Sequence, residues 1–163
     1  MNIQGKFPNT RLRRNRMKEF SRRLVAENNL SADDLILPLF VCEGNNVEDP
    51  IQSMPGVSRY SIDKLLHKVE EAVKLSIPAI AIFPQIETSL KNAEGSLAFD
   101  ENNLVCRSIK SIKKEFSNVG IICDVALDPF TDHGHDGLVI NDKIDNDKTL
   151  DILEKQALVQ VDA

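Results

Sequence analysis

Three short apolar runs, separated by segments of helical periodicity, constrain the fold of this chain most strongly. The runs are LILPLFV at 35–41, AIAIFP at 79–84 and GIICDVAL at 120–127. Continuous apolar runs of this length suit strands that are buried on both faces, as in a parallel sheet. Each interval between them is long enough to return the chain for a parallel partner. The order strand, helix, strand, helix, strand, helix therefore predicts an α/β fold.

Three helices are predicted from apolar spacings of three and four. The first follows a turn at 53–60 and can be capped by Ser61; its apolar residues are Ile62, Leu65, Leu66, Val69, Ala72 and Val73. The second places Val105, Ile109, Ile112 and Phe116 on one face and lysines 110, 113 and 114 outside. The third begins near Asp147 and presents Leu150, Leu153, Ala157 and Val161.

Two α/β architectures fit this order: a doubly wound sheet, or part of a (β/α)8 barrel. A whole barrel needs about 250 residues, so about three βα units in 163 residues are too few to close one. Pro38 favours an edge strand or a strand at the start of a barrel, because proline cannot donate to a ladder. Residues 1–30 are predicted to form an extended or loosely helical arm, with a short helix in FSRRLVAENN, and residues 31–163 the α/β part.

Charge and cysteine content narrow the class of protein. The net charge of −5 argues against a nucleic-acid or anionic-membrane partner, and the basic segment 11–23, with seven Lys and Arg, is most simply a solvated arm. No apolar run approaches the roughly 20 residues of a membrane helix, and the first ten residues lack the apolar core of a secretory signal. Cys42, Cys106 and Cys123 form neither a disulfide framework nor a zinc knuckle, which predicts a reducing, cytoplasmic location.

Ligands of both architectures lie beyond the carboxyl ends of the strands. Three segments reach that edge: CEGNN, PQIETSLKNAEG and DPFTDHGHDG. The long polar connection at 85–103 is a candidate lid. Asp124 lies in the third apolar run, where an unpaired carboxylate is costly. It is therefore either a structural aspartate bonded to backbone or a lysine, or a functional carboxylate aimed into the mouth of a barrel.

The two histidines of the third segment leave two alternatives open. His133 and His135 point to the same side if the segment is extended, as chelating ligands can, or they are solvent-exposed loop residues. A small metal-dependent lyase or hydrolase could use Asp124, Asp128, His133 and Asp136 as ligands.

The motifs together resemble the porphobilinogen synthases, also called 5-aminolevulinate dehydratases. The resemblance spans nearly the whole chain and rests on RLRRNR, LILPLFVCEG, SMPGVSRYSID, AIAIFP, TSLKNAEGSLAF and above all DVALDPFTDHGHDG. It implies a (β/α)8 TIM barrel with an N-terminal arm, and a lyase that condenses two 5-aminolevulinate molecules to porphobilinogen in heme biosynthesis. It also implies homo-oligomers, octamers in the family, in which the arm wraps a neighbouring subunit.

The resemblance also implies a metal preference. Zinc-using members carry D-x-C-x-C followed by H-G-x-C-G, and the three cysteine positions here are Ala126, Asp128 and Asp136. Because oxygen ligands suit magnesium and alanine offers no ligand, we expect magnesium and no catalytic zinc. Asp124 matches the family's active-site aspartate, which assists proton transfer or holds a lysine pair electrostatically, and His133 matches its H-G motif. Asp128 and Asp136 are expected either to bind a metal or to contact the substrate amine.

The two Schiff-base lysines of the family lie in the second half of its barrel, and no lysine of this chain matches them. The chain therefore corresponds to the N-terminal half of a zinc-independent member, and we expect it to be inactive alone. A non-catalytic half-barrel that binds full-length subunits through its arm is the alternative.

Overall fold

The computed structural model describes residues 5–6, 8–10 and 13–163, so Arg11 of the basic segment lies outside the described residues. The chain divides into two compact units at Ser31. The first contains two short helices, α1 (Arg14–Met17) and α2 (Glu19–Leu24), in which no residue is buried. The predicted helix within 20–29 is thus present, but it starts one residue earlier and ends five residues sooner.

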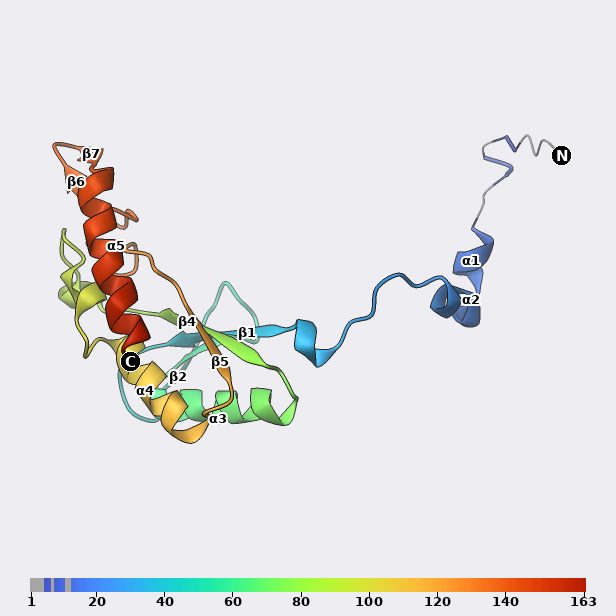
Figure 1. The fold of residues 1–163 in the computed structure, drawn as a ribbon, viewed down its shortest axis with the longest axis horizontal. Helices are drawn as coiled ribbons and strands as arrows, with labels where there is room; N and C mark the ends of the chain where they lie inside the picture. The colour runs from blue at the N-terminus through green and yellow to red at the C-terminus, as the bar shows by residue number, and fades with distance from the viewer. Residues whose placement is uncertain (1–4, 7, 11–12) are drawn as a thin grey trace. The chain divides into compact units, whose positions relative to one another are not determined.

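The second unit is built on a five-stranded sheet in the order β2-β3-β1-β4-β5 (Figure 1). Its strands are β1 (Ile36–Val41), β2 (Glu48–Pro50), β3 (Ser58–Tyr60), β4 (Ala79–Pro84) and β5 (Gly120–Cys123). β3, β1, β4 and β5 run parallel, and β2 runs antiparallel to β3. The three predicted strands and the parallel α/β sheet are confirmed. β2 and β3 were not predicted, because each is only three residues long and lacks an apolar run.

Three long helices accompany the sheet: α3 (Ile62–Lys74), α4 (Leu104–Glu115) and α5 (Asn146–Val161). α3 and α4 lie on the same face of the sheet (Figure 1), where their buried residues join those of the strands in one core. Short 3-10 helices occupy the connections: η1 (Ala32–Asp34), η2 (Thr88–Leu90) and η3 (Ser96–Phe99). A two-stranded hairpin, β6 (Val139–Ile140) and β7 (Lys143–Ile144), precedes α5.

Ser61 occupies the N-cap position of α3 but does not cap it, contrary to the sequence-based expectation. Its hydroxyl donates to Asp63 Oδ1 at 2.6 Å and accepts from the Val47 amide at 2.9 Å. Asp63 in turn accepts from the Asn46 amide, at 2.9 Å for Oδ2. The hydrogen bonds to Ser61 and Asn46 lower the pKa of Asp63, the bond to Ser61 most strongly. Ser61 therefore links the connection after β1 to the first turn of α3 through hydrogen bonds.

Burial of the sheet is one-sided among the described residues, which corrects the expectation of strands buried on both faces. Leu39, Val41, Ile80 and Ile82 are at most 5% exposed on the helix-covered face. On the other face, Ile36 is 54% and Ile122 46% exposed. Pro38 lies where β1 pairs with β4 alone, because β3 reaches only Phe40 and Val41. Its missing N–H therefore interrupts no ladder on the β3 side.

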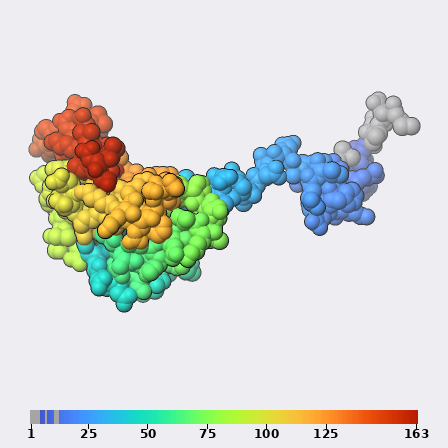
Figure 2. Space-filling model, turned by 60° about the horizontal axis from the view of Figure 1, so that its bottom comes forward, coloured from blue at the N-terminus to red at the C-terminus, as the bar shows by residue number. Residues whose placement is uncertain are grey.

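The predicted apolar face of α5 is wrong in part. Leu150 is 63% and Val161 83% exposed, whereas Thr149 and Gln156 are buried. α5 packs against η3 and α4, and Figure 2 shows it in red over the yellow and orange segments of the second unit. The buried face of α5 therefore includes Thr149 and Gln156, whose side chains donate to backbone carbonyls, and two of the predicted apolar residues face outward. No helix among the described residues is long and apolar enough to cross a membrane.

Replacing Ile82 with alanine should lower the free energy of unfolding by about 2–5 kcal/mol, since a fully buried branched side chain would leave a cavity. Ile82 is 1% exposed in β4. Ile122→Ala in β5, where the side chain is 46% exposed, is the control and should have a much smaller effect. Urea unfolding followed by circular dichroism measures both, and equal losses would contradict the one-sided core.

Candidate active site

β5 ends at Cys123, four residues earlier than the predicted strand. Its ladder with β4 pairs Ile82 with Cys123, and β4 then ends at Pro84, which has no N–H to continue it. Asp124 therefore lies just beyond the strand and is exposed, rather than buried within it. Because the carboxylate of Asp124 is exposed, it carries no cost of burial and needs no backbone or lysine partner to offset one.

A cavity of about 210 Å³ opens at the carboxyl ends of β1, β4 and β5. Asp124, Ala126 and Asp128 all line it, as expected for alternate residues of one segment. The remaining lining is mostly apolar: Phe40, Ile82, Phe83, Pro84, Val105, Pro129 and Phe130. Two carboxylates at the mouth of an apolar cavity are suited to binding a cation and to moving protons.

The carboxylates of this region interact with one another. Partial burial raises the pKa of Asp128, and the negative charges of Asp136 and then Asp124 raise it further. Asp136 does not line the cavity; its Oδ1 accepts a hydrogen bond from the Leu127 amide at 2.6 Å. Asp136 thus supports the backbone between the two cavity-lining aspartates while its charge acts on one of them.

The segments at 88–99 and 128–138 are hydrogen-bonded to each other. The connection at 85–103, which was predicted as a lid, is therefore fixed to the loop after β5. Asn92 and Thr131 form an isolated parallel bridge, and the Asp132 amide donates to Asn92 O at 3.2 Å. Gly95 approaches Thr131 with φ +58°, where a Cβ would lie 3.3 Å from the threonine methyl. A left-handed backbone at this contact favours glycine.

His133 is part of this connection. Its Nε2 lies 3.2 Å from Ala93 O, and its Nδ1 accepts from the His135 amide at 3.2 Å. This pattern requires the proton on Nε2. Both ring nitrogens are therefore occupied within the loop. The ring centroids of His133 and His135 lie 5.4 Å apart, and the two ring planes are inclined by 35°.

Among residues 5–6, 8–10 and 13–163, no group of three His, Cys, Asp or Glu side chains is placed to hold a metal ion. The four-ligand set of a small metal-dependent hydrolase is therefore not assembled in the described part of the chain. Asp124 and Asp128 meet at the cavity, Asp136 lies behind Leu127, and His133 faces Ala93. In CEGNN, the first of the three segments predicted to reach this edge, Glu43 forms an ion pair with Arg107 of α4.

Three residues near the cavity were not identified from the sequence. Lys91 follows η2, and its charge lowers the pKa of Asp128 against the larger upward effects. Gln156 and Gln160 of α5 donate to backbone carbonyls of Ala126 and Asp124. The signal for the glutamines was their spacing of four residues, which places both on one face of a helix.

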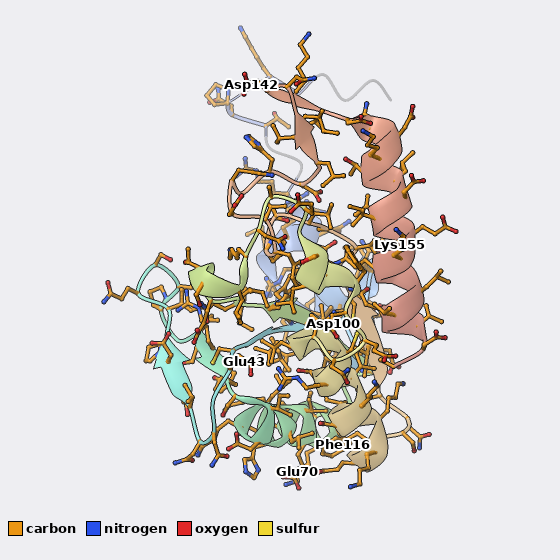
Figure 3. All side chains as sticks on the ribbon, turned by 90° about the vertical axis from the view of Figure 1, so that its left-hand side faces the viewer. Glu43, Glu70, Asp100, Phe116, Asp142 and Lys155 are labelled. Atoms are coloured by element: carbon orange, nitrogen blue, oxygen red, sulfur yellow. The ribbon has the colours of Figure 1, made fainter. Side chains whose placement is uncertain are left out.

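A larger hollow of about 370 Å³ lies at the opposite end of the strands, between the ends of α3 and α4. Figure 3 labels Phe116, which lines it, at the end of the molecule opposite Asp142. Glu115 is its only charged lining residue among those described. Because ligands of parallel α/β sheets bind at the carboxyl ends, the smaller cavity with two carboxylates is the better candidate.

The three cysteines are free, as predicted, and should be unreactive in the folded chain. Burial raises the pKa of each thiol, and that of Cys123 at the end of β5 rises to about 11. At pH 8, Cys123 should therefore react with a disulfide reagent about 100-fold more slowly than a free cysteine, since only the thiolate attacks. Labelling with and without urea, read by mass spectrometry, measures this. Fast native labelling of Cys123, compared with Cys123→Ser, would contradict it.

The chain is similar to known proteins over nearly its whole length. The sequence profile described as delta-aminolevulinic acid dehydratase matches residues 9–163. Curated relatives of that name are 55% identical in Bradyrhizobium diazoefficiens and 43% in Methanothermus sociabilis. The first match covers 94% of this chain and 43% of the relative, the second 97% and 48%. The chain thus spans less than half the length of these relatives.

A solved structure gives the same result for the fold. It is delta-aminolevulinic acid dehydratase (porphobilinogen synthase) from Toxoplasma gondii ME49, in complex with the reaction product porphobilinogen. The match has a TM-score of 0.88 at 40% identity and covers 93% of this chain and 44% of that one.

Proposed function

Because the chain belongs to the delta-aminolevulinic acid dehydratase family, we propose that it forms the N-terminal part of an enzyme that condenses two 5-aminolevulinate molecules to porphobilinogen. The observation that carries this proposal is the cavity at the carboxyl end of the parallel sheet. Asp124, Ala126 and Asp128 line it together, and they occupy the family's motif positions in order. The reaction belongs to tetrapyrrole, and so heme, biosynthesis.

The fold proposed for the whole enzyme is a (β/α)8 barrel, of which this chain supplies about three βα units. Two features support this: the parallel strands β1, β4 and β5, and the helices on one face only. In a barrel, the less covered face would turn inward. The partition into an arm at 1–30 and a barrel part at 31–163 belongs to the same proposal.

Asp124 is the proposed proton-transfer group. It is exposed and lines the cavity, and its carboxylate makes no hydrogen bond to the described residues. A carboxylate in an apolar cavity can accept a proton from substrate carbon or nitrogen and return it. Asp128, which lines the same cavity, would either contact the cationic amine of the substrate or bind a metal together with Asp136. His133 would fix the loop through Ala93 rather than touch the substrate.

Magnesium is the proposed metal. It takes oxygen ligands, commonly one or two carboxylates with several waters, and a cation would relieve the repulsion between Asp128 and Asp136. These two residues would hold it, and it would supply positive charge beside the cavity. A hydrolase-like set of three protein ligands is not required for such a site. The enzyme is proposed to work in the cytoplasm, without nucleic-acid or membrane partners.

The arm is proposed to bind a second subunit in a homo-oligomer. Its short helices expose Met17 (76%), Phe20 (64%) and Leu24 (81%) beside several arginines. Exposed large apolar side chains of this density suit a protein contact better than a solvated arm. An octamer is the assembly implied by the family.

A chimera tests the proposed function. Residues 1–163 are joined to the C-terminal remainder of the Bradyrhizobium diazoefficiens relative, which is 55% identical over the matched part. We expect the chimera to form porphobilinogen from 5-aminolevulinate, measured by a colorimetric pyrrole assay. The remainder alone is the control and should form none. A chimera that melts cooperatively but forms no product would refute the proposal.

Cysteine substitution tests the metal. Thiolates at the three motif positions should bind zinc, because soft deprotonated sulfur selects it. The chimera with Ala126→Cys, Asp128→Cys and Asp136→Cys together should become inactive with a zinc chelator, whereas the parent chimera keeps its activity. Asp132→Cys alone is the matched control. Stoichiometric zinc in the parent, with activity lost on its removal, would overturn the magnesium assignment.

A further inference from the structure

We propose that Gln156 and Gln160 of α5 are positioning residues, which hold the backbone at 124–126 so that Asp124 and Asp128 face the cavity. Gln160 Nε2 donates to Asp124 O at 3.0 Å, and Gln156 Nε2 donates to Ala126 O at 3.0 Å. Neither side chain lines the cavity, so both act through the segment that does. The inference deepens the proposed function and rests on it for its kinetic consequence only.

The spacing of the two contacts follows from the geometry of helices and extended chains. Residues four apart on a helix lie on one face, separated by about 6 Å along its axis. Alternate carbonyls of an extended chain point the same way and lie about 6.6 Å apart. Two glutamines at i and i+4 therefore match two carbonyls at j and j+2. The order is reversed, Gln156 with Ala126 and Gln160 with Asp124, because α5 runs back along the segment.

The segment needs such support because it leaves the sheet. The ladder with β4 stops at Cys123, and no strand among the described residues pairs with the other edge of β5. Figure 1 shows the chain running on from β5 toward α5. Beyond Ala126, the Leu127 amide is held by Asp136 at 2.6 Å. The glutamines thus support the stretch between the end of the sheet and this aspartate.

The burial of Gln156 supports the same role. It is 0% exposed, and its Oε1 has no hydrogen-bond partner within the described structure. An unsatisfied buried amide oxygen is unfavourable, and an apolar side chain of similar size would avoid it. Packing alone therefore does not explain a glutamine here. The bond from its Nε2 to the Ala126 carbonyl does.

Fixing carbonyls also fixes side chains. In an extended segment the direction of the C=O groups sets the faces to which the side chains point. Holding Asp124 O and Ala126 O therefore sets the direction of the Asp124 carboxylate and fixes the start of the turn that carries Asp128. Loosening the segment should misplace both groups without removing either, which predicts a loss in kcat with little change in KM.

The test uses Gln156→Met and Gln160→Met, which keep the length of the side chain and remove the donor. Glu154→Met is the matched control, because it changes an exposed residue of the same helix. In the 163-residue chain, hydrogen exchange at the Leu127 amide should quicken about fivefold to tenfold in each glutamine variant, with the amides of α5 unchanged. In the chimera, kcat should fall at least about tenfold. The variant Gln160→Lys keeps an N–H donor, so its chimera should retain most of the kcat of the parent chimera.

The outcomes separate this proposal from the proposed function. An inactive parent chimera would refute the function and leave the exchange result as the deciding measurement. Wild-type exchange at Leu127 in Gln160→Met would overturn the positioning role, and so would faster exchange spread evenly along α5. If Gln156→Met fails to fold, Gln160→Met decides alone, because its side chain is only half-buried.

Discussion

Replacing Asp124 with asparagine is expected to lower the turnover of the chimera by about 100-fold or more, the usual contribution of a positioned acid–base group. Asparagine keeps the shape of the side chain and the Gln160 bond to the main-chain carbonyl, but it cannot carry the proton. The metal content should stay the same, because the proposed ligands are Asp128 and Asp136. Steady-state kinetics and metal analysis on the same preparation measure both effects.

Asp132→Asn is the control for this substitution. Asp132 is an exposed aspartate of the same loop that does not line the cavity. Its variant should keep the turnover of the parent. If Asp124→Asn also keeps full turnover, Asp124 has no proton-transfer role, and its contribution is limited to the charge that it places beside Asp128.

The 163-residue chain alone is expected to form no porphobilinogen and to trap no substrate. The family's chemistry needs two lysine amines that become imines with substrate ketones. No lysine among the described residues lines the cavity, and Lys91 is the one lysine whose charge is seen to lower the pKa of Asp128. Borohydride reduction with 5-aminolevulinate, followed by peptide mass spectrometry, should therefore find no adduct on this chain.

The chimera is the positive control for that experiment, with adducts expected only on lysines of its C-terminal remainder. Lys91→Met in the chimera should keep the adducts. An adduct on Lys91 of the isolated chain, together with product, would contradict the prediction and make Lys91 a Schiff-base residue.

The parallel sheet could be predicted from the sequence because its strands are continuous apolar runs. β1 and β4 match their predicted ranges to within one residue. α3 and α4 were predicted because each buries one apolar stripe, and Lys110, Lys113 and Lys114 are exposed as expected. These elements are specified by local pattern and by burial together.

The elements that were missed are specified by contacts distant in sequence. β3 forms only because β1 offers Phe40 and Val41 as partners. The β6–β7 hairpin turns through Asn141 and Asp142, both with positive φ, and such a pair is a turn signal that could have been recognised. The buried face of α5 was misassigned because its buried residues, Thr149 and Gln156, are polar, and an apolar pattern does not place polar residues inside.

For the site, the sequence was sufficient to choose the segment but not the direction of its side chains. Asp124 and Asp128 meet at one cavity, as the position of DPFTDHGHDG predicted. The carboxylate of Asp136 is turned to the Leu127 amide and the imidazole of His133 to Ala93, and no spacing rule reveals such choices. Only the packed loops decide them.

The hydrogen bonds from α5 to the segment after β5 bear on which substitutions that segment tolerates, because they are made to main-chain carbonyls. Those carbonyls are present whatever side chains stand at 124 and 126, so substitution there leaves the helix contacts intact. Substitutions at 124 and 126 should therefore change the lining of the cavity without altering the path of the backbone.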